Sequence, residues 1–185
     1  MSINLTKGNS FNLTKEEPAL KKVMVGMGWD NGSNVIDLDA SAFMVGSNLK
    51  LLADEYFIFY NNLKSPDGAL QHTGDNRTGE GNGDDEMILT NLDLVNPLIT
   101  EIYFIVTIHE AAARKHNFGL LKNAYIRIYD VDNKREVLRY SLNNEIGDYT
   151  DMEFGKLQKI NNEWRFVAIG NGSNKGLQGF VHIYA

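Results

Sequence analysis

The sequence contains no cysteine and only three prolines among its 185 residues. Without cysteine, the chain has neither a disulfide framework nor thiolate chemistry. Long apolar runs are also missing: the longest, Ile102 to Val106, is far shorter than the roughly 20 residues that a membrane-spanning helix needs. The first residues lack the apolar core of a signal peptide. We therefore expect a cytoplasmic protein.

Positive charge is scarce as well. The chain has 18 lysines and arginines against 24 aspartates and glutamates, which gives a net charge of −6 and a pI near 5.2. No block of five basic residues occurs, and the densest cluster is Lys21-Lys22. Nucleic acid is therefore not expected as a partner. Direct binding to an anionic membrane surface would need a bridging cation.

Alternating apolar and polar residues predict β-strands through most of the chain. In residues 22–29 the apolar side chains share one face and Gly26 and Gly28 lie on the other, so a neighbouring group should pack closely over these glycines. Residues 101–109 are apolar on both faces, which indicates a central, buried strand. The pair Asn161-Asn162 predicts a hairpin turn.

These patterns predict an all-β fold, an antiparallel β-sandwich of two packed sheets with one or two short helices. A closed barrel is the alternative. The length fits a single domain over residues 1–185, because domains of this size bury about 70% of their unfolded surface. A helical turn is expected at 110–116, the tail 177–184 closes the chain, and strands are expected at 3–5, 11–13, 22–29, 36–45, 48–52, 56–60, 86–92, 101–109, 123–130, 136–142, 152–160 and 164–170.

The stretch Gly74 to Glu86 concentrates negative charge and glycine, with only Arg77 opposing its carboxylates. Like charges about 4 Å apart repel by roughly 1 kcal/mol per pair even at the dielectric constant of water, and a bound cation would remove that cost. Oxygen ligands on a flexible loop suit calcium better than zinc or magnesium. A solvated acidic turn is the alternative. The carboxylates are Asp75, Glu80, Asp84, Asp85 and Glu86.

A second acidic pair lies in the expected strand 36–45. Side chains two residues apart share a face, so Asp37 and Asp39 project together from one side of this strand. Aspartate is disfavoured in strands, and two on one face are costly unless a cation or several donors compensate. Either a cation binds there or the pair lies at a hydrated strand end.

Standard catalytic and metal motifs do not fit. The helix-flanked calcium loop fails because, counting from Asp75, its third and fifth positions are Arg77 and Gly79. The HExxH zinc motif fails because Ala113 stands where the second histidine would be. His72 lies near the acidic stretch, where it either bonds to a carboxylate or packs at the rim.

Two longer motifs are specific in combination: Asp37 to Phe43 (DLDASAF) and Gly74 to Glu86 (GDNRTGEGNGDDE). Together with Gly28-Trp29-Asp30, Tyr60-Asn61-Asn62 and Glu163 to Gly170, they resemble the tellurium-resistance TerD family of calcium-binding proteins, nearly end to end. The resemblance implies a β-sandwich that binds two calcium ions, with roles in resistance to tellurite, phage and colicins and in general stress responses. The implied metal ligands are Asp37, Asp39, Asp75, Asn76, Glu80, Gly81, Asp84, Asp85 and Glu86.

The resulting hypothesis is a non-enzymatic calcium-binding protein. Calcium would order the acidic loop and present a surface to a protein partner in a stress-response complex, or to a membrane surface through the metal. The alternative is a metal-dependent hydrolase that acts on a phosphate-containing substrate. A third possibility is a structural subunit in which the metal joins two loops. The calcium hypothesis assumes that Asp37 and Asp39 converge with the acidic loop.

Overall fold

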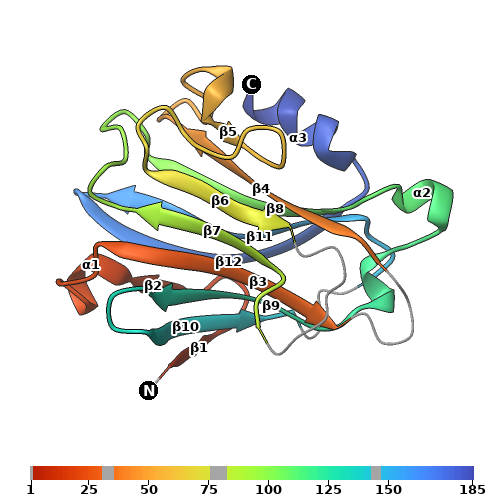
Figure 1. The fold of residues 1–185 in the computed structure, drawn as a ribbon, viewed down its shortest axis with the longest axis horizontal. Coiled ribbons are helices and arrows are strands. Elements are labelled where there is room, and N and C mark those ends of the chain that lie inside the picture. Colours follow the sequence, from red (N-terminus) through yellow and green to blue (C-terminus); the bar gives the residue numbers. More distant parts are fainter. Residues whose placement is uncertain (1, 31–35, 76–82, 143–146) are drawn as a thin grey trace.

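The computed structural model describes residues 2–30, 36–75, 83–142 and 147–185. Two six-stranded sheets pack face to face (Figure 1), which confirms the predicted sandwich. Sheet A has the strand order β1-β10-β9-β3-β7-β6, and sheet B the order β2-β12-β11-β8-β4-β5. All neighbouring strands run antiparallel except β1 and β10, which are parallel.

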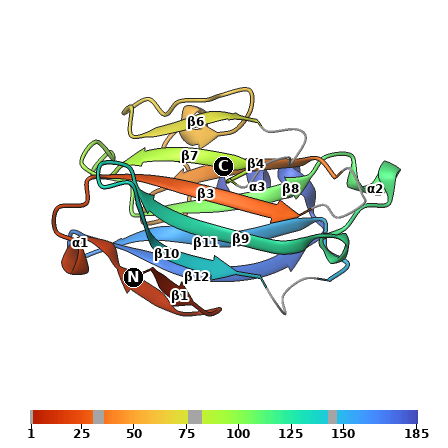
Figure 2. The same cartoon turned by 60° about the horizontal axis from the view of Figure 1, so that its bottom comes forward.

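Sheet A faces forward in Figure 2. It consists of β1 Ile3–Leu5, β3 Lys22–Asp30, β6 Leu70–Asp75, β7 Glu86–Asn91, β9 Lys122–Asp130 and β10 Arg135–Ser141. Sheet B consists of β2 Ser10–Asn12, β4 Leu38–Val45, β5 Phe57–Ile58, β8 Glu101–Ile108, β11 Asp151–Ile160 and β12 Glu163–Ser173. The described helices are α1 Leu13–Glu16, α2 Ala111–Arg114 and α3 Gly176–Tyr184, with 3-10 turns η1 Asp54–Tyr56 and η2 Phe118–Leu120.

The main core lies between the two sheets. Strand β3 sends Val23, Val25 and Met27 into it, all fully buried, as the alternation predicted. Strand β8 lies between β11 and β4 and is buried along almost its whole length, which confirms that residues 101–109 form a central strand. None of the described helices is long and apolar enough to span a membrane.

The hairpin between β11 and β12 turns at Asn161 and Asn162, as predicted. Both residues have positive φ, 52° and 63°, and Ile160 pairs with Glu163 across the turn. Two consecutive positive φ angles are typical of the two-residue turn that matches strand twist. The predicted strands at 48–52 and 56–60 were wrong in extent, since this region forms η1 and the two-residue β5.

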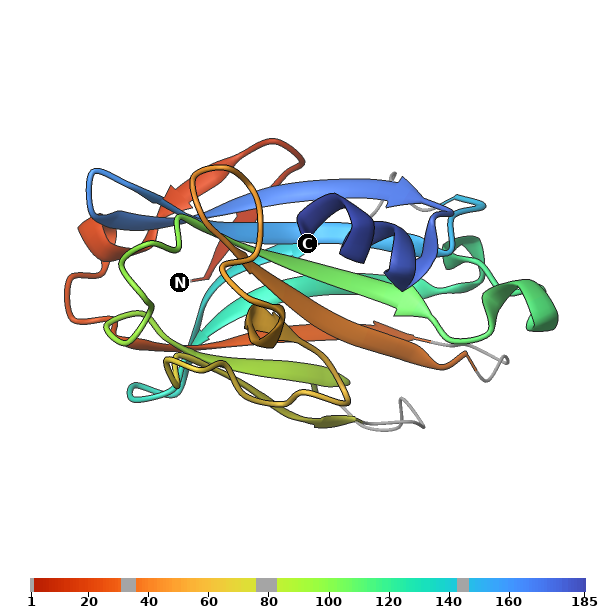
Figure 3. The ribbon, with the colours of Figure 1, turned by 90° about the horizontal axis from the view of Figure 1, so that it is seen from above.

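The tail forms helix α3, which lies over the outer face of sheet B (Figure 3). Its Phe180 and Tyr184 are buried in a second apolar cluster with Phe43, Val45 and Ile105 of that face. Leu177, Phe180, Val181 and Tyr184 follow the spacing of an amphipathic helix. Sequence analysis assigned no secondary structure to this tail, although this spacing is a helix signal.

Candidate functional site

The acidic segments lie at one end of the sandwich. The end of β3, the start of β4, the end of β6 and the start of β7 are all found there (Figures 1 and 3). Asp75 is the last residue of β6 and pairs in register with Glu86. The predicted ligands Asn76, Glu80 and Gly81 lie outside the described residues.

Asp84 lies on the outer face of sheet A, over Gly26 of β3. A Cβ atom at Gly26 would come within 2.0 Å of Asp84 Oδ2, so the carboxylate occupies the space that the missing side chain leaves. Tyr125 covers Gly28 in the same way. These contacts confirm that groups pack closely over both glycines.

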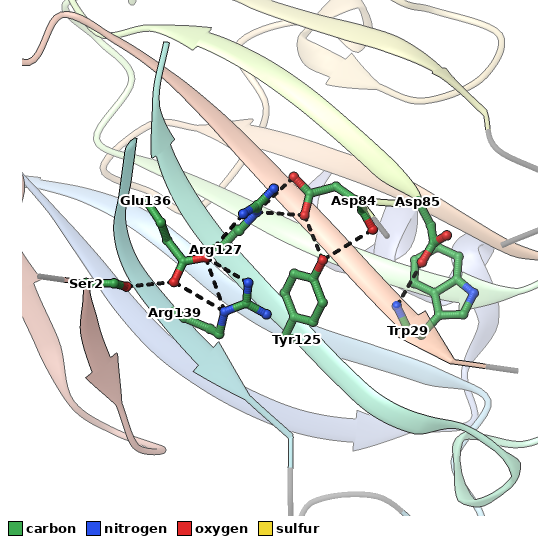
Figure 4. A network of polar contacts seen from close by, with 9 residues as sticks. Ser2, Trp29, Asp84, Asp85, Tyr125, Arg127, Glu136 and Arg139 are labelled. Atoms are coloured by element: carbon green, nitrogen blue, oxygen red, sulfur yellow. Dashed lines mark hydrogen bonds and ion pairs between the residues drawn. The ribbon is translucent and has the colours of Figure 1, made fainter. Parts of the chain in front are cut away.

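A network of charged groups holds Asp84 in this position (Figure 4). Arg127 Nε donates to Asp84 Oδ1 at 2.8 Å, and the Tyr125 hydroxyl donates to the same oxygen at 2.9 Å. Arg127 Nη1 also donates to Glu136 at 3.2 Å, and Glu136 accepts from Arg139 at 2.7 Å. Asp84 therefore already has a cationic partner within the protein.

The network changes the acidity of its members. Burial raises the pKa of the Glu136 carboxyl, but hydrogen bonds from Arg139, Ser2 and Arg127 outweigh it and leave the pKa at about 2. Burial, followed by the charge of Asp84, raises the pKa of Tyr125 to about 12. At neutral pH the network consists of two carboxylates, two guanidinium groups and a neutral phenol.

Asp85 is held differently from its neighbour. Its backbone N–H donates to the Met27 carbonyl at 2.9 Å, and its Oδ2 accepts from the Trp29 backbone N–H at 2.8 Å. Only 6% of the residue is exposed. Burial raises the pKa of the Asp85 carboxyl; the Trp29 hydrogen bond opposes this rise and the nearby charge of Asp84 adds to it.

Glu86 points into the sandwich, where its Oε2 lies 3.1 Å from His72 Nε2. The two side chains are 1% and 2% exposed. His72 therefore lies within ion-pair distance of a carboxylate of the acidic stretch. Three consecutive carboxylates therefore have three different environments: a guanidinium for Asp84, a backbone N–H for Asp85 and an imidazole for Glu86.

Asp39 belongs to β4 of the other sheet, and Asp37 lies just before that strand. Leu38 and Ala40 are buried in the main core while the two aspartates are partly exposed, so the predicted alternation is confirmed. His109 Nδ1 lies 3.6 Å from Asp39 Oδ2, and the His109 backbone N–H donates to the Asp37 carbonyl at 2.8 Å.

The outer faces of sheets A and B point in opposite directions, and packed sheets lie about 10 Å apart. The structure therefore does not bring Asp84 and Asp39 into contact with one ion. In the described parts of the chain, no three acidic or histidine side chains are grouped closely enough to hold a metal. The nine-residue ligand set stays a prediction; its described members lie at the end of β6, at and just before the start of β7, and around the start of β4.

Sequence analysis missed the role of Arg127. In the expected strand 123–130, Tyr125 and Arg127 alternate with apolar residues that are buried, so both lie on the outer face of sheet A. Nothing in the spacing of residues linked that face to Asp84, because the link depends on β9 and β7 both lying beside β3 in sheet A. Pairing of distant strands cannot be read from local periodicity.

The fold and this end define a class of protein: a β-sandwich with an acidic, glycine-rich connection between two strands of one sheet. The TerD domain family matches residues 1–184, and the chain belongs to that family. It is 49% identical to the tellurium resistance protein TerD of Serratia marcescens over 180 residues, covering 96% of this chain and 94% of that protein. It is 43% identical to general stress protein 16U of Bacillus subtilis over 181 residues, covering 96% and 94%.

A solved structure has the same fold. The crystal structure of a homologue of telluride resistance protein (TerD) from Streptomyces coelicolor matches with a TM-score of 0.71 at 22% sequence identity. The match covers 88% of this chain and 95% of that one. The structural match shows the fold, and the sequence matches place the chain in the TerD family, which includes proteins named for tellurium resistance and general stress.

Proposed function

We propose that this protein is a non-enzymatic calcium-binding protein whose acidic end binds calcium ions and acts as a calcium-dependent interaction module for a partner protein. A cytoplasmic location is part of the same proposal. The relatives compared above are named for tellurium resistance and general stress, and none of these names is that of an enzyme.

The observation that carries the proposal is the environment of Asp85. Its carboxyl group is almost fully buried next to another carboxylate, and its described hydrogen bond comes from a neutral backbone N–H. Burying a carboxylate costs several kcal/mol unless an opposite charge compensates. A doubly charged cation would supply that compensation and would favour the ionised form.

The available donors suit calcium, because all the predicted ligands are oxygen atoms. Asp85 would bind calcium together with loop ligands, which are Asp75, Asn76, Glu80 and the carbonyl of Gly81. Asp84 and Glu86 would interact both with the ion and with the side chains that already contact them, Arg127 and His72. Asp37 and Asp39 would serve an ion at the start of β4. The bound metal supplies positive charge that orders these carboxylates.

Calorimetric titration with calcium tests the proposal, with thermal unfolding in calcium and in chelator as a second measurement. At a hundredfold excess over the dissociation constant, calcium should stabilise the fold by about 2.7 kcal/mol. Asp85→Asn should weaken binding at least tenfold, because it removes one charged ligand. Asp93→Asn is the matched control, since Asp93 is an exposed aspartate that pairs with Lys21.

Equal unfolding midpoints in calcium and in chelator would contradict the proposal. Turnover of a phosphate ester that disappears in Asp85→Asn would favour the hydrolase instead. Calcium-dependent co-sedimentation with a protein partner, lost in the same variant, would support the interaction role.

A further inference from the structure

A cavity of about 480 Å³ lies at the end of the sandwich opposite the acidic segments. It is lined by α1, by residues that precede β3, by residues that follow β7 and by the hairpin between β11 and β12, so both sheets border it (Figure 1). Its volume falls in the range of about 300–1,000 Å³ that is typical of small-molecule sites. All the residues that line it belong to the described parts of the chain.

Lys159 is the most informative residue of this cavity, because it stands where the strand pattern calls for an apolar side chain. Leu157 of β11 is fully buried in the main core, and Lys159, two residues further along, points to the same side of the sheet. Lys159 also pairs in register with Trp164 of β12, which is 5% exposed and belongs to the same core. The inner face of sheet B therefore ends in an ammonium group at the cavity.

The Lys159 ammonium has an aromatic partner but no acidic one. Its Nζ lies 5.2 Å from the centre of the Trp164 ring, and among the described residues it makes neither an ion pair nor a hydrogen bond. The ring attracts a cation through its quadrupole but carries no net charge, so it does not neutralise the ammonium. Three N–H donors are therefore left for an anionic ligand.

The other charged groups of the cavity balance each other. Lys21 Nζ lies 3.3 Å from Asp93 Oδ1, and both residues line the cavity. The lining thus contains two lysines and one aspartate, which leaves one positive charge, that of Lys159. A single uncompensated positive charge favours a ligand with a single negative charge.

A hydroxyl group supplies a second kind of donor. Thr14 Oγ1 accepts a hydrogen bond from the Trp164 backbone N–H at 3.0 Å, which places this hydroxyl beside the same tryptophan. A hydroxyl that accepts one bond still has its own proton to donate, and no described group accepts it. A carboxylate only accepts hydrogen bonds, so it fits a cavity that offers an ammonium and a hydroxyl.

The rest of the wall is largely aliphatic. Leu20, Leu92 and Val95 are 4%, 5% and 7% exposed, and they line the cavity together with Pro18 and Pro97. An aliphatic wall beside an ammonium group suits a ligand with an acidic head and an alkyl body, because each part meets a group of its own kind.

We propose that this cavity binds a small aliphatic monocarboxylate. Its carboxylate accepts hydrogen bonds from the Lys159 ammonium and from the Thr14 hydroxyl, which gives one charge-assisted bond. Its alkyl chain lies against Leu20, Leu92 and Val95. The site shares no residue with the proposed calcium ligands and lies at the opposite end of the sandwich, so it is additional to the calcium function.

Titration of the full chain with hexanoate in calcium-free buffer, followed by NMR, tests the proposal. We expect saturable binding, with shifts at the Trp164 indole N–H and at Val95. Hexanamide has the same chain and no charge, so it should bind about tenfold more weakly or worse. Butanoate should bind more weakly than hexanoate by about fourfold for each of its missing methylene groups.

Substitutions of Lys159 test the assigned head group. Lys159→Met keeps an unbranched apolar side chain and removes the charge, so it should weaken hexanoate about tenfold or more. Lys159→Arg keeps the charge and should bind hexanoate more tightly than Lys159→Met does.

Lys175→Met is the matched control. Lys175 Nζ also lies over an aromatic ring, 4.7 Å from the centre of Phe180, and it too has no acidic partner among the described residues. It lies at the start of α3, outside this cavity, so its variant should bind hexanoate like the wild type.

Three results on the wild type would overturn the proposal: no saturable binding of hexanoate, equal binding of hexanamide, or equal binding of inorganic phosphate. Unchanged affinity in Lys159→Met would also overturn it. Equal weakening in Lys159→Met and Lys175→Met would do the same, because it would show attraction to the net charge of the protein instead of a site.

The carboxylate and calcium proposals can fail separately. Asp85→Asn should lose calcium and keep hexanoate, whereas Lys159→Met should lose hexanoate and keep calcium. Loss of hexanoate binding in Asp85→Asn would place the anion at the acidic end and overturn the cavity assignment.

Discussion

The outer faces of the two sheets are built differently: sheet A carries a network of charged side chains, and sheet B carries an apolar cluster under a helix. On sheet A, which none of the described helices covers, Asp84 and Glu136 are matched by Arg127 and Arg139. On sheet B, α3 covers the apolar middle of the face, and Asp39 lies at the end of that face, with His109 Nδ1 3.6 Å from its Oδ2. Acidic residues alone therefore do not mark a ligand site, because those on sheet A are already paired with guanidinium groups of the protein.

The largest loss of stability should come from a change in helix α3, which packs on the outer face of sheet B. Phe180→Ala removes a fully buried side chain from the cluster that joins α3 to the sheet. We expect a loss of about 3–5 kcal/mol in the free energy of unfolding, measured by urea denaturation, because the lost contacts leave a cavity. Ile183→Ala on the same helix is the control: Ile183 is 43% exposed and should cost under about 0.5 kcal/mol. Equal costs would mean that α3 contributes little to stability.

A change in the charged network on sheet A should give the next largest loss in the free energy of unfolding. Arg127→Met leaves Asp84, whose side chain is 3% exposed, without its guanidinium partner. We expect a loss of about 2–3 kcal/mol in chelator, less than for a fully buried pair because Arg127 is 23% exposed. The double variant Arg127→Met/Asp84→Asn should recover part of this loss, since the uncompensated charge is gone.

The stability of Arg127→Met should also be measured with calcium present. If the ion shares Asp84, calcium should restore part of the stability that Arg127→Met loses. Additive effects in the double variant would show that Arg127 and Asp84 do not interact.

Much of the fold could be predicted from the sequence because a strand with one buried face carries its own signal. The alternation in β3 and β4, the apolar run of β8 and the Asn161-Asn162 turn all proved correct. The region around β5 could not be predicted, because its short strand depends on pairing with β4 rather than on periodicity.

The candidate site was less predictable for the same reason. The sequence identified which segments are acidic, and it placed Asp37 and Asp39 on one face of a strand. It could not show that this face and the one that carries Asp84 point in opposite directions, because strand order decides that. Nor could it show that Arg127 already neutralises Asp84.

Acid should weaken the network on sheet A through Glu136. The pKa of Glu136 is about 2 in the folded protein against an ordinary value of 4.5, so the unfolded chain binds more protons between these pH values. The stabilisation is complete above about pH 4.5 and is lost as the pH falls toward 2. Allowing for solvent screening, we expect the advantage of wild type over Glu136→Gln to shrink by about 1 kcal/mol between pH 6 and 3. Urea unfolding of both proteins across this range measures it; a constant difference would contradict it.

The smallest effect should come from an ion pair at the other end of sheet A. Lys21 Nζ lies 3.3 Å from Asp93 Oδ1, and both side chains are more than half exposed. Water screens this pair and ordering two long side chains costs entropy, so Lys21→Ala should change the free energy of unfolding by less than about 0.5 kcal/mol. Removing the positive charge of Arg127 should lower the free energy of unfolding several times more, because its partner Asp84 is buried. A Lys21→Ala loss as large as that of Arg127→Met would show that burial does not determine how much these ion pairs stabilise the fold.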